Sequence, residues 1–145
     1  MPLLDTDAEI QRALETSPTV AVLGAHDDPF RPAFYVPDYL FRKGYRILPV
    51  NPTKVGKVLW GEPIRATLAG VGVVDMVDVF RRSEDLPGHL DELLALAPRY
   101  VWLQLGIRNA AVVSALVEAG IGVIEDRCTL QDHRHFGLGR PVARD

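Results

Sequence analysis

The sequence has little of what would tie it to a disulfide, a membrane or nucleic acid. It contains a single cysteine, Cys128, which excludes an internal disulfide and a Cys-x-x-Cys metal site. No apolar run approaches the roughly 18 residues of a membrane-spanning helix, and the start MPLLDTDAEI lacks the basic and apolar segments of a signal peptide. The net charge of −3 offers no overall basic field to nucleic acid. We therefore expect a cytoplasmic protein that binds neither nucleic acid nor a membrane.

What is present is the composition of one ordinary globular domain. The chain has 145 residues, of which 48% are hydrophobic and 24% charged. It has no low-complexity segment and no internal repeat. We expect a single domain over residues 1–145, with a core over about 6–135 and a polar C-terminal arm over 136–145.

Short, β-branched, continuous apolar runs indicate strands that are buried on both faces, as in a parallel sheet. Segments with helical patterns separate these runs, which indicates βαβ units with helices on both faces of the sheet. The fold class is therefore α/β, a Rossmann-like, doubly wound and mainly parallel five-stranded sheet. The expected strands are Thr19–Leu23, Arg46–Val50, Val73–Phe80, Tyr100–Leu105 and Gly122–Glu125.

The helices have their own sequence signals. Thr6 and Glu9 form a capping box for a first helix that ends near Ser17. Asn109 is a good N-cap for a helix that runs to Ala119. Two further helices are expected over 34–43 and 84–97, a short one over 65–68 within an irregular crossover, and a last short helix before the arm.

The loop after the first strand is the first place to look for a ligand, because doubly wound sheets bind at the carboxyl ends of their strands. Gly24 opens that loop, but the dinucleotide fingerprint G-x-G-x-x-G fails at His26 and Pro29. The acidic residue that would hold a ribose hydroxyl is also missing. Asn51 stands in its place and Lys54 follows, which favours a nucleotide with an additional phosphate over NAD.

Several motifs occur in order along the chain: Gly24-Ala25 with Asp28-Pro29-Phe30-Arg31-Pro32, Leu48-Pro49-Val50-Asn51-Pro52, Val77-Asp78-Val79-Phe80-Arg81-Arg82, Val101-Trp102-Leu103-Gln104-Leu105-Gly106 and Asp126-Arg127-Cys128. Together they resemble the small single-domain CoA-binding proteins, a family similar to the CoA-binding N-terminal domain of the succinyl-CoA synthetase α subunit. The resemblance covers about residues 6–135. It implies that coenzyme A is the cofactor, held at the switch point of the sheet.

The resemblance also implies which residues bind. The loop from Gly24 to Arg31 would hold the phosphates, Lys54 would contact CoA, and the turn at Phe80 would line the nucleotide pocket. The family often has serine where this chain has Phe30 and Ala33, so we expect backbone N–H groups and Arg31 to replace hydroxyl contacts. The expected cofactor-binding residues are Gly24, Ala25, His26, Asp28, Arg31, Pro32, Asn51, Pro52, Lys54, Val79, Phe80 and Arg81.

Other polar residues favour structural roles. Asp75 and Asp78 fall on opposite faces of one strand, so they do not form a carboxylate pair for acid–base chemistry. We expect Asp78 to be buried with a hydrogen-bonding partner, and Gln104 to face the pantetheine side of the cleft. His133 and His135 are two residues apart, which is not a helical metal-binding spacing.

Cys128 follows the last expected strand, and its role has two possible interpretations. As an inert, half-buried cysteine it would do nothing chemical. As a functional residue it would have its pKa lowered by Arg127. If it lay beside the pantetheine arm, oxidising conditions would give a mixed disulfide with CoA.

The motifs contain no nucleophile–base pair, metal cluster or carboxylate pair, so we expect no catalytic residues and no metal site. The expected function is non-catalytic binding of coenzyme A or an acyl-CoA. Two alternatives stay open: an NAD(P)-dependent oxidoreductase, and an acyl-CoA-responsive regulatory or scaffold subunit of a partner enzyme. A protein partner or a homodimer also stays open.

Overall fold

A computed structural model describes residues 3–142 and contains one five-stranded, entirely parallel sheet. Its strand order is β2-β1-β5-β6-β7, and the strands are β1 (Thr19–Leu23), β2 (Arg46–Val50), β5 (Met76–Val79), β6 (Tyr100–Leu103) and β7 (Gly122–Ile124). The chain runs outward from β1 to β2, then returns to pair β5 with the other side of β1. The switch point therefore lies between β1 and β5. The predicted doubly wound fold is confirmed.

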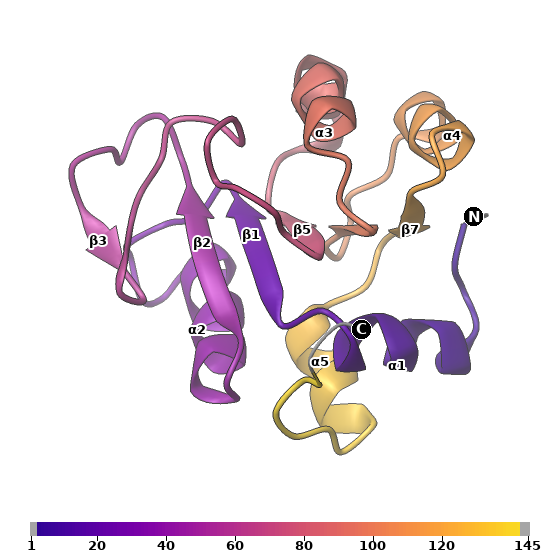
Figure 1. The fold of residues 1–145 in the computed structure, drawn as a ribbon, viewed down its shortest axis with the longest axis horizontal. Coiled ribbons are helices and arrows are strands. Elements are labelled where there is room, and N and C mark those ends of the chain that lie inside the picture. Colours follow the sequence, from indigo (N-terminus) through magenta and orange to yellow (C-terminus); the bar gives the residue numbers. More distant parts are fainter. Residues whose placement is uncertain (1–2, 143–145) are drawn as a thin grey trace.

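Helices cover both faces of the sheet (Figure 1). The helices α3 (Leu90–Leu96) and α4 (Ala110–Glu118) lie on one face, where they bury a core that includes Leu93 and Leu116. The helices α1 (Asp7–Glu15), α2 (Pro32–Arg42) and α5 (Thr129–His135) lie on the other, over a second core centred on Trp102. Burial on both sides explains why the strands read as continuous apolar runs.

The predicted helix caps are confirmed. The Thr6 side chain accepts a hydrogen bond from Glu9 N, and the Glu9 carboxylate accepts one from Thr6 N, which completes the capping box of α1. Asn109 Oδ1 accepts a hydrogen bond from Val112 N at the start of α4. Both caps satisfy backbone donors that the first turn of a helix leaves free.

The prediction of a short helix over 65–68 was wrong. The backbone of Arg65 instead forms an isolated parallel bridge with Val50: Arg65 N donates to Pro49 O, and Asn51 N donates to Arg65 O. The same crossover contains a two-stranded hairpin, β3 (Val58–Leu59) and β4 (Glu62–Pro63), that we did not expect. The Arg65 bridge extends the sheet edge beside β2, a tertiary pairing that local helical propensity does not reveal, whereas the hairpin forms a separate two-stranded sheet.

The helix expected over 84–97 is divided. Ser83–His89 forms a 3-10 helix (η1) that contains Pro87, and α3 begins only at Leu90. The strand expected over Val73–Phe80 begins later, at Met76. In both cases the regular element is shorter than the apolar pattern, because proline and the ends of the sheet limit the hydrogen-bond ladder.

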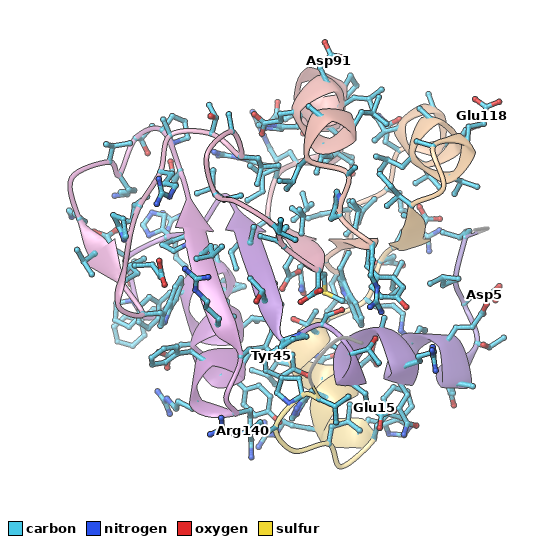
Figure 2. The ribbon with its side chains drawn as sticks, in the orientation of Figure 1. Asp5, Glu15, Tyr45, Asp91, Glu118 and Arg140 are labelled. Carbon is cyan, nitrogen blue, oxygen red and sulfur yellow. The ribbon has the colours of Figure 1, made fainter. Side chains whose placement is uncertain are left out.

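The last part of the chain packs back onto the domain. Phe136 and Leu138 join the core under α1 and α2, and Val142 N donates to Glu15 O at the end of α1. Figure 2 shows Tyr45 directed toward α1, where its hydroxyl donates to Leu14 O. The described part of the predicted arm is thus fixed to the domain, while residues 143–145 of that arm lie outside the described residues. None of the helices within residues 3–142 combines the length and the hydrophobicity of a membrane-spanning segment.

Candidate functional site

A pocket of about 850 Å³ lies at the carboxyl ends of the strands. It extends from the switch point between β1 and β5 across the ends of β6 and β7. We call it the carboxyl-end pocket. It is lined by Gly24, His26, Arg31, Pro32, Ala33, Tyr35, Val36, Asn51, Phe80, Arg81, Arg82, Ser83, Glu84, Gln104, Leu105, Gly106, Ile107, Cys128, Leu130 and Gln131.

Gly24 is required where β1 ends. Its φ is +92°, a conformation that residues with a Cβ rarely adopt. A Cβ built on Gly24 would lie 2.4 Å from the carbonyl oxygen of Phe80. Gly24 N also donates to Val50 O at the end of β2. The glycine therefore lets three strand ends converge beneath the pocket.

Short-range hydrogen bonds shape the loop from Gly24 to Arg31. The Asp28 amide donates to His26 Nδ1 at 3.0 Å, and the Phe30 amide donates to Asp28 Oδ1 at 3.0 Å. The helix α2 then begins with Pro32 at its first turn, and its N-cap, Arg31, provides no side-chain cap. The positive end of an uncapped helix lies at the pocket wall, which suits an anionic ligand.

A proline inside α2 holds this loop in place. Pro37 has no N–H to donate to the carbonyl of Ala33, four residues earlier. That carbonyl accepts a hydrogen bond from His26 N at 3.3 Å instead. The helix thus gives one of its carbonyl groups to the pocket loop.

Three arginines line the pocket, and they differ in their partners. Arg82 is paired with Glu84 and Asp85, and Arg31 lies 3.8 Å from the Asp28 carboxylate. Arg81 forms no ion pair with any residue in the range 3–142, and its Nε is buried without a hydrogen-bond partner. Arg81 is therefore the pocket cation with the least competition for an anion.

Lys54 does not line the pocket. Its Nζ lies 3.2 Å from Asp27 Oδ1, and Lys57 binds the other oxygen of the same carboxylate. Hydrogen bonds from Lys57 and Lys54 hold the pKa of Asp27 well below its usual range. Lys54 is thus fixed beside the pocket loop by an acid of that loop.

Asn51 has a structural role at the end of β2. Its Nδ2 donates to Ala25 O at 2.8 Å, while its Oδ1 accepts hydrogen bonds from the backbone and hydroxyl groups of Thr53. The residue is 5% exposed and joins the β1 loop to the β2 loop. An acidic residue could accept the Thr53 bonds but could not donate to Ala25.

The pocket brings together some of the predicted binding residues and not others. Gly24, His26, Arg31, Pro32, Asn51, Phe80 and Arg81 line it; Ala25, Asp28, Pro52, Lys54 and Val79 do not. Ala25 and Val79 are fully buried in the core. Ser83, Leu130 and Gln131 are among the lining residues that the sequence did not predict. Ser83 lies shortly after β5, where the carboxyl-end rule could have found it, whereas Leu130 and Gln131 lie in the first turn of α5.

A closed polar triangle lies under the pocket between β5, β6 and α5. Gln104 Nε2 donates to Asp78 Oδ1 at 2.5 Å and to Thr129 Oγ1 at 3.0 Å, and Thr129 Oγ1 donates to Asp78 Oδ2 at 3.1 Å. Asp78 is fully buried, and burial raises its pKa to about 7. The expectation that Asp78 is buried with hydrogen-bonding partners is confirmed.

Cys128 lines the pocket but is not an activated thiol. Arg127 is directed at Asp132, with two hydrogen bonds of 2.8 Å. Burial raises the pKa of Cys128, and the carboxylates of Asp78 and Asp132 raise it further. The reading in which Arg127 lowers this pKa was therefore wrong, because Asp132 takes up the guanidinium.

The histidines of the C-terminal segment do not meet as ligands. His133 is buried; its Nδ1 shares a hydrogen bond with the Tyr39 hydroxyl, and its Nε2 bonds to Gly139 O. Among residues 3–142, no three His, Cys, Asp or Glu side chains gather in an arrangement that could hold a metal ion. His133 therefore fixes the C-terminal segment to α2.

Comparison with known proteins agrees with this geometry. The profile of a family described as "CoA binding domain" matches residues 18–134. The uncharacterized protein YneT of Bacillus subtilis is 37% identical over 126 residues, which cover 87% of this chain and 93% of YneT.

Two solved structures share the fold closely. The structure of cell-free ID.343 from Thermus thermophilus is 50% identical with a TM-score of 0.88, and the match covers 90% of this chain and 98% of that one. A hypothetical protein from Pyrococcus horikoshii OT3 is 26% identical with a TM-score of 0.86, over 95% of this chain and 97% of its own. From the matched profile, the similar relatives and the shared fold, we conclude that this chain belongs to the CoA binding domain family.

Proposed function

We propose that the chain binds coenzyme A or an acyl-CoA in the carboxyl-end pocket and carries out no chemistry of its own. The observation that carries this proposal is that Gly24 and Arg81 lie next to each other in the lining of the pocket. The glycine that ends β1 lies beside a cation that has no acidic partner among residues 3–142, and the N-terminus of α2 adds its dipole.

The charge of the pocket walls supports one orientation of CoA. The arginines of the pocket, Arg31, Arg81 and Arg82, come from the loops after β1 and β5. The lining residues after β6 and β7, Gln104–Ile107 with Cys128, Leu130 and Gln131, carry no charge. The phosphates therefore belong at the β1–β5 end and the neutral pantetheine arm at the β6–β7 end.

The 3′-phosphate separates CoA from its rivals. NAD and dephospho-CoA lack this group, and the end of β2 has Asn51 in place of an acid that would hold a free ribose hydroxyl. Losing a charge-assisted contact should weaken binding about 10- to 150-fold. We expect the affinity order CoA, then dephospho-CoA, then NAD, measured by calorimetry at one ionic strength.

Salt provides a second check on the same titrations. The contacts are ionic and partly exposed, so CoA binding should weaken as the ionic strength rises. If NAD binds as tightly as CoA, the oxidoreductase function replaces this proposal.

A further inference from the structure

At the uncharged end of the carboxyl-end pocket, one side-chain amide is held in its orientation by hydrogen bonds on the side that faces away from the pocket. Gln104 follows β6, lines the pocket and is 5% exposed. Its Nε2 donates both of its protons inward, one to Asp78 Oδ1 and one to Thr129 Oγ1. With Asp78 ionised and the Thr129 hydroxyl proton donated to Asp78 Oδ2, only the nitrogen can satisfy both partners, because the two oxygens that it meets accept and do not donate.

The other atom of this amide is left without a partner. No hydrogen bond among residues 3–142 uses Gln104 Oε1. Within the described chain, the buried side-chain nitrogen and oxygen atoms without a hydrogen-bond partner are Ser17 Oγ and Arg81 Nε. Gln104 Oε1 is not among them, so this unpaired oxygen is not enclosed in the core. Since the nitrogen is turned toward Asp78, the oxygen faces the pocket.

We propose that Gln104 Oε1 accepts a hydrogen bond from an amide N–H of the pantetheine arm, and that Asp78 and Thr129 are positioning residues that keep this acceptor turned toward the ligand. The inference rests on the proposed binding of CoA and adds the recognition of its arm. A ligand that places an acceptor at this point would leave Oε1 unpaired and be disfavoured.

The chemistry of the arm fits this end of the pocket. Pantetheine carries two secondary amides separated by methylene groups, and it has no charge. The wall around Gln104 is formed by Leu105, Ile107, Cys128 and Leu130, which offer apolar contact to the methylenes. A single fixed acceptor on an apolar wall selects for an N–H at one position along the chain of the ligand.

The first experiment compares two ligands on two proteins. Wild type and Gln104→Met are titrated with CoA and with adenosine 3′,5′-bisphosphate, a nucleotide half that lacks the arm. We expect Gln104→Met to weaken CoA about 2- to 12-fold, the range of one neutral hydrogen bond, and to leave the bisphosphate within about twofold of wild type.

Each other result has a distinct meaning. Equal weakening of both ligands would mean that Gln104 supports the pocket as a whole, which overturns the proposal. Unchanged CoA binding by Gln104→Met would overturn it as well. If neither ligand binds wild type, the proposed function itself fails, and this outcome is distinguishable from the other two.

A test on the ligand avoids any folding defect of the variant. Wild type is titrated with two CoA analogues, in each of which one amide N–H of the arm is replaced by an ester oxygen. We expect one of the two analogues to bind about 2- to 12-fold more weakly than CoA, and this difference to shrink in Thr129→Val, where Gln104 loses one of its two anchors. Analogues that both bind wild type like CoA would overturn the proposal.

Discussion

Gly24 and Phe80 approach each other so closely that a Cβ on Gly24 would lie 2.4 Å from the Phe80 carbonyl oxygen. This contact joins the end of β1 to the end of β5 at the switch point, where the pocket begins. The position requires both a positive φ and an absent side chain, two separate demands on the same residue.

Gly24→Ala should therefore destabilise the fold and disrupt the pocket. The left-handed backbone alone costs an alanine about 1–2 kcal/mol, and the contact with Phe80 adds to it. Gly120→Ala is the control, because Gly120 has a similar φ of +85° with nothing within 4 Å of its missing Cβ. Thermal unfolding should show a larger loss for Gly24→Ala. Equal losses in the two variants would mean that the approach to Phe80 has no energetic consequence.

Removing a pocket arginine should weaken CoA with little effect on the fold. Arg81→Ala and Arg31→Ala each remove a guanidinium that faces the proposed phosphate end, so we expect a loss of about tenfold or more in calorimetry. Arg46→Ala is the matched control, since Arg46 starts β2 at the far end of the strand and pairs with Glu62. Arginine variants that bind like the control would place the phosphates elsewhere.

Lys54 and Lys57 share Asp27 but should differ toward the ligand. If Lys54 exchanges Asp27 for the 3′-phosphate, Lys54→Ala narrows the affinity gap between CoA and dephospho-CoA, while Lys57→Ala leaves it unchanged. Both variants lose one cation from the same carboxylate, so the comparison isolates the position of the charge. An unchanged gap in Lys54→Ala would assign the 3′-phosphate to one of the cations that line the pocket.

Asp78 should make stability depend on pH in a direction opposite to that of a salt-bridged acid. Burial raises its pKa to about 7 in the folded state, above the unfolded value of about 3.9. The folded state then binds more protons between these two values, so stability falls as pH rises from about 4 to 7, with a slope of up to about 1.4 kcal/mol per pH unit.

Denaturant unfolding from pH 5 to 8 checks this dependence. Asp78→Asn should flatten it, because an amide does not titrate. Asp75→Asn is the control, because Asp75 is a second aspartate near β5 that is 5% exposed. Its side chain accepts a hydrogen bond from Thr19 N and takes no part in the polar triangle of Asp78. A wild-type slope that survives in Asp78→Asn would have to come from another group.

Cys128 should react slowly with disulfides. Its raised pKa leaves little thiolate at neutral pH, and the residue is 8% exposed. Incubation with CoA disulfide at pH 7 should give a mixed disulfide, detected by intact mass, far more slowly than a small free thiol gives one. The rate should rise as pH increases above 8. Rapid and complete addition at pH 7 would show that the thiol is activated after all.

The sequence predicted the sheet well because its strands are buried on both faces. Continuous apolar runs such as Thr19–Leu23 carry that signal by themselves. The segment around Arg65 was mispredicted because its backbone is fixed by pairing with Val50, a partner in another part of the chain. The two-residue strands of the β3–β4 hairpin are too short to show any periodicity.

For the site, the glycine loop was predictable and the ion pairs were not. Gly24 after a buried strand indicates a carboxyl-end pocket from sequence alone. That Lys54 turns to Asp27, and Arg127 to Asp132, depends on the geometry of loops and on a helix start. Spacing along the chain does not determine which of several nearby acids a long basic side chain will meet.

The carbonyl that Pro37 leaves free has a consequence for transferring this site to another protein. The position of His26 depends on a residue in the middle of α2, which does not itself line the pocket. A graft of residues 24–31 alone would carry the loop without its anchor, because a helix with an ordinary residue at position 37 would use the Ala33 carbonyl internally. The shortest segment that could be transferred with the loop held in place therefore includes the second turn of α2.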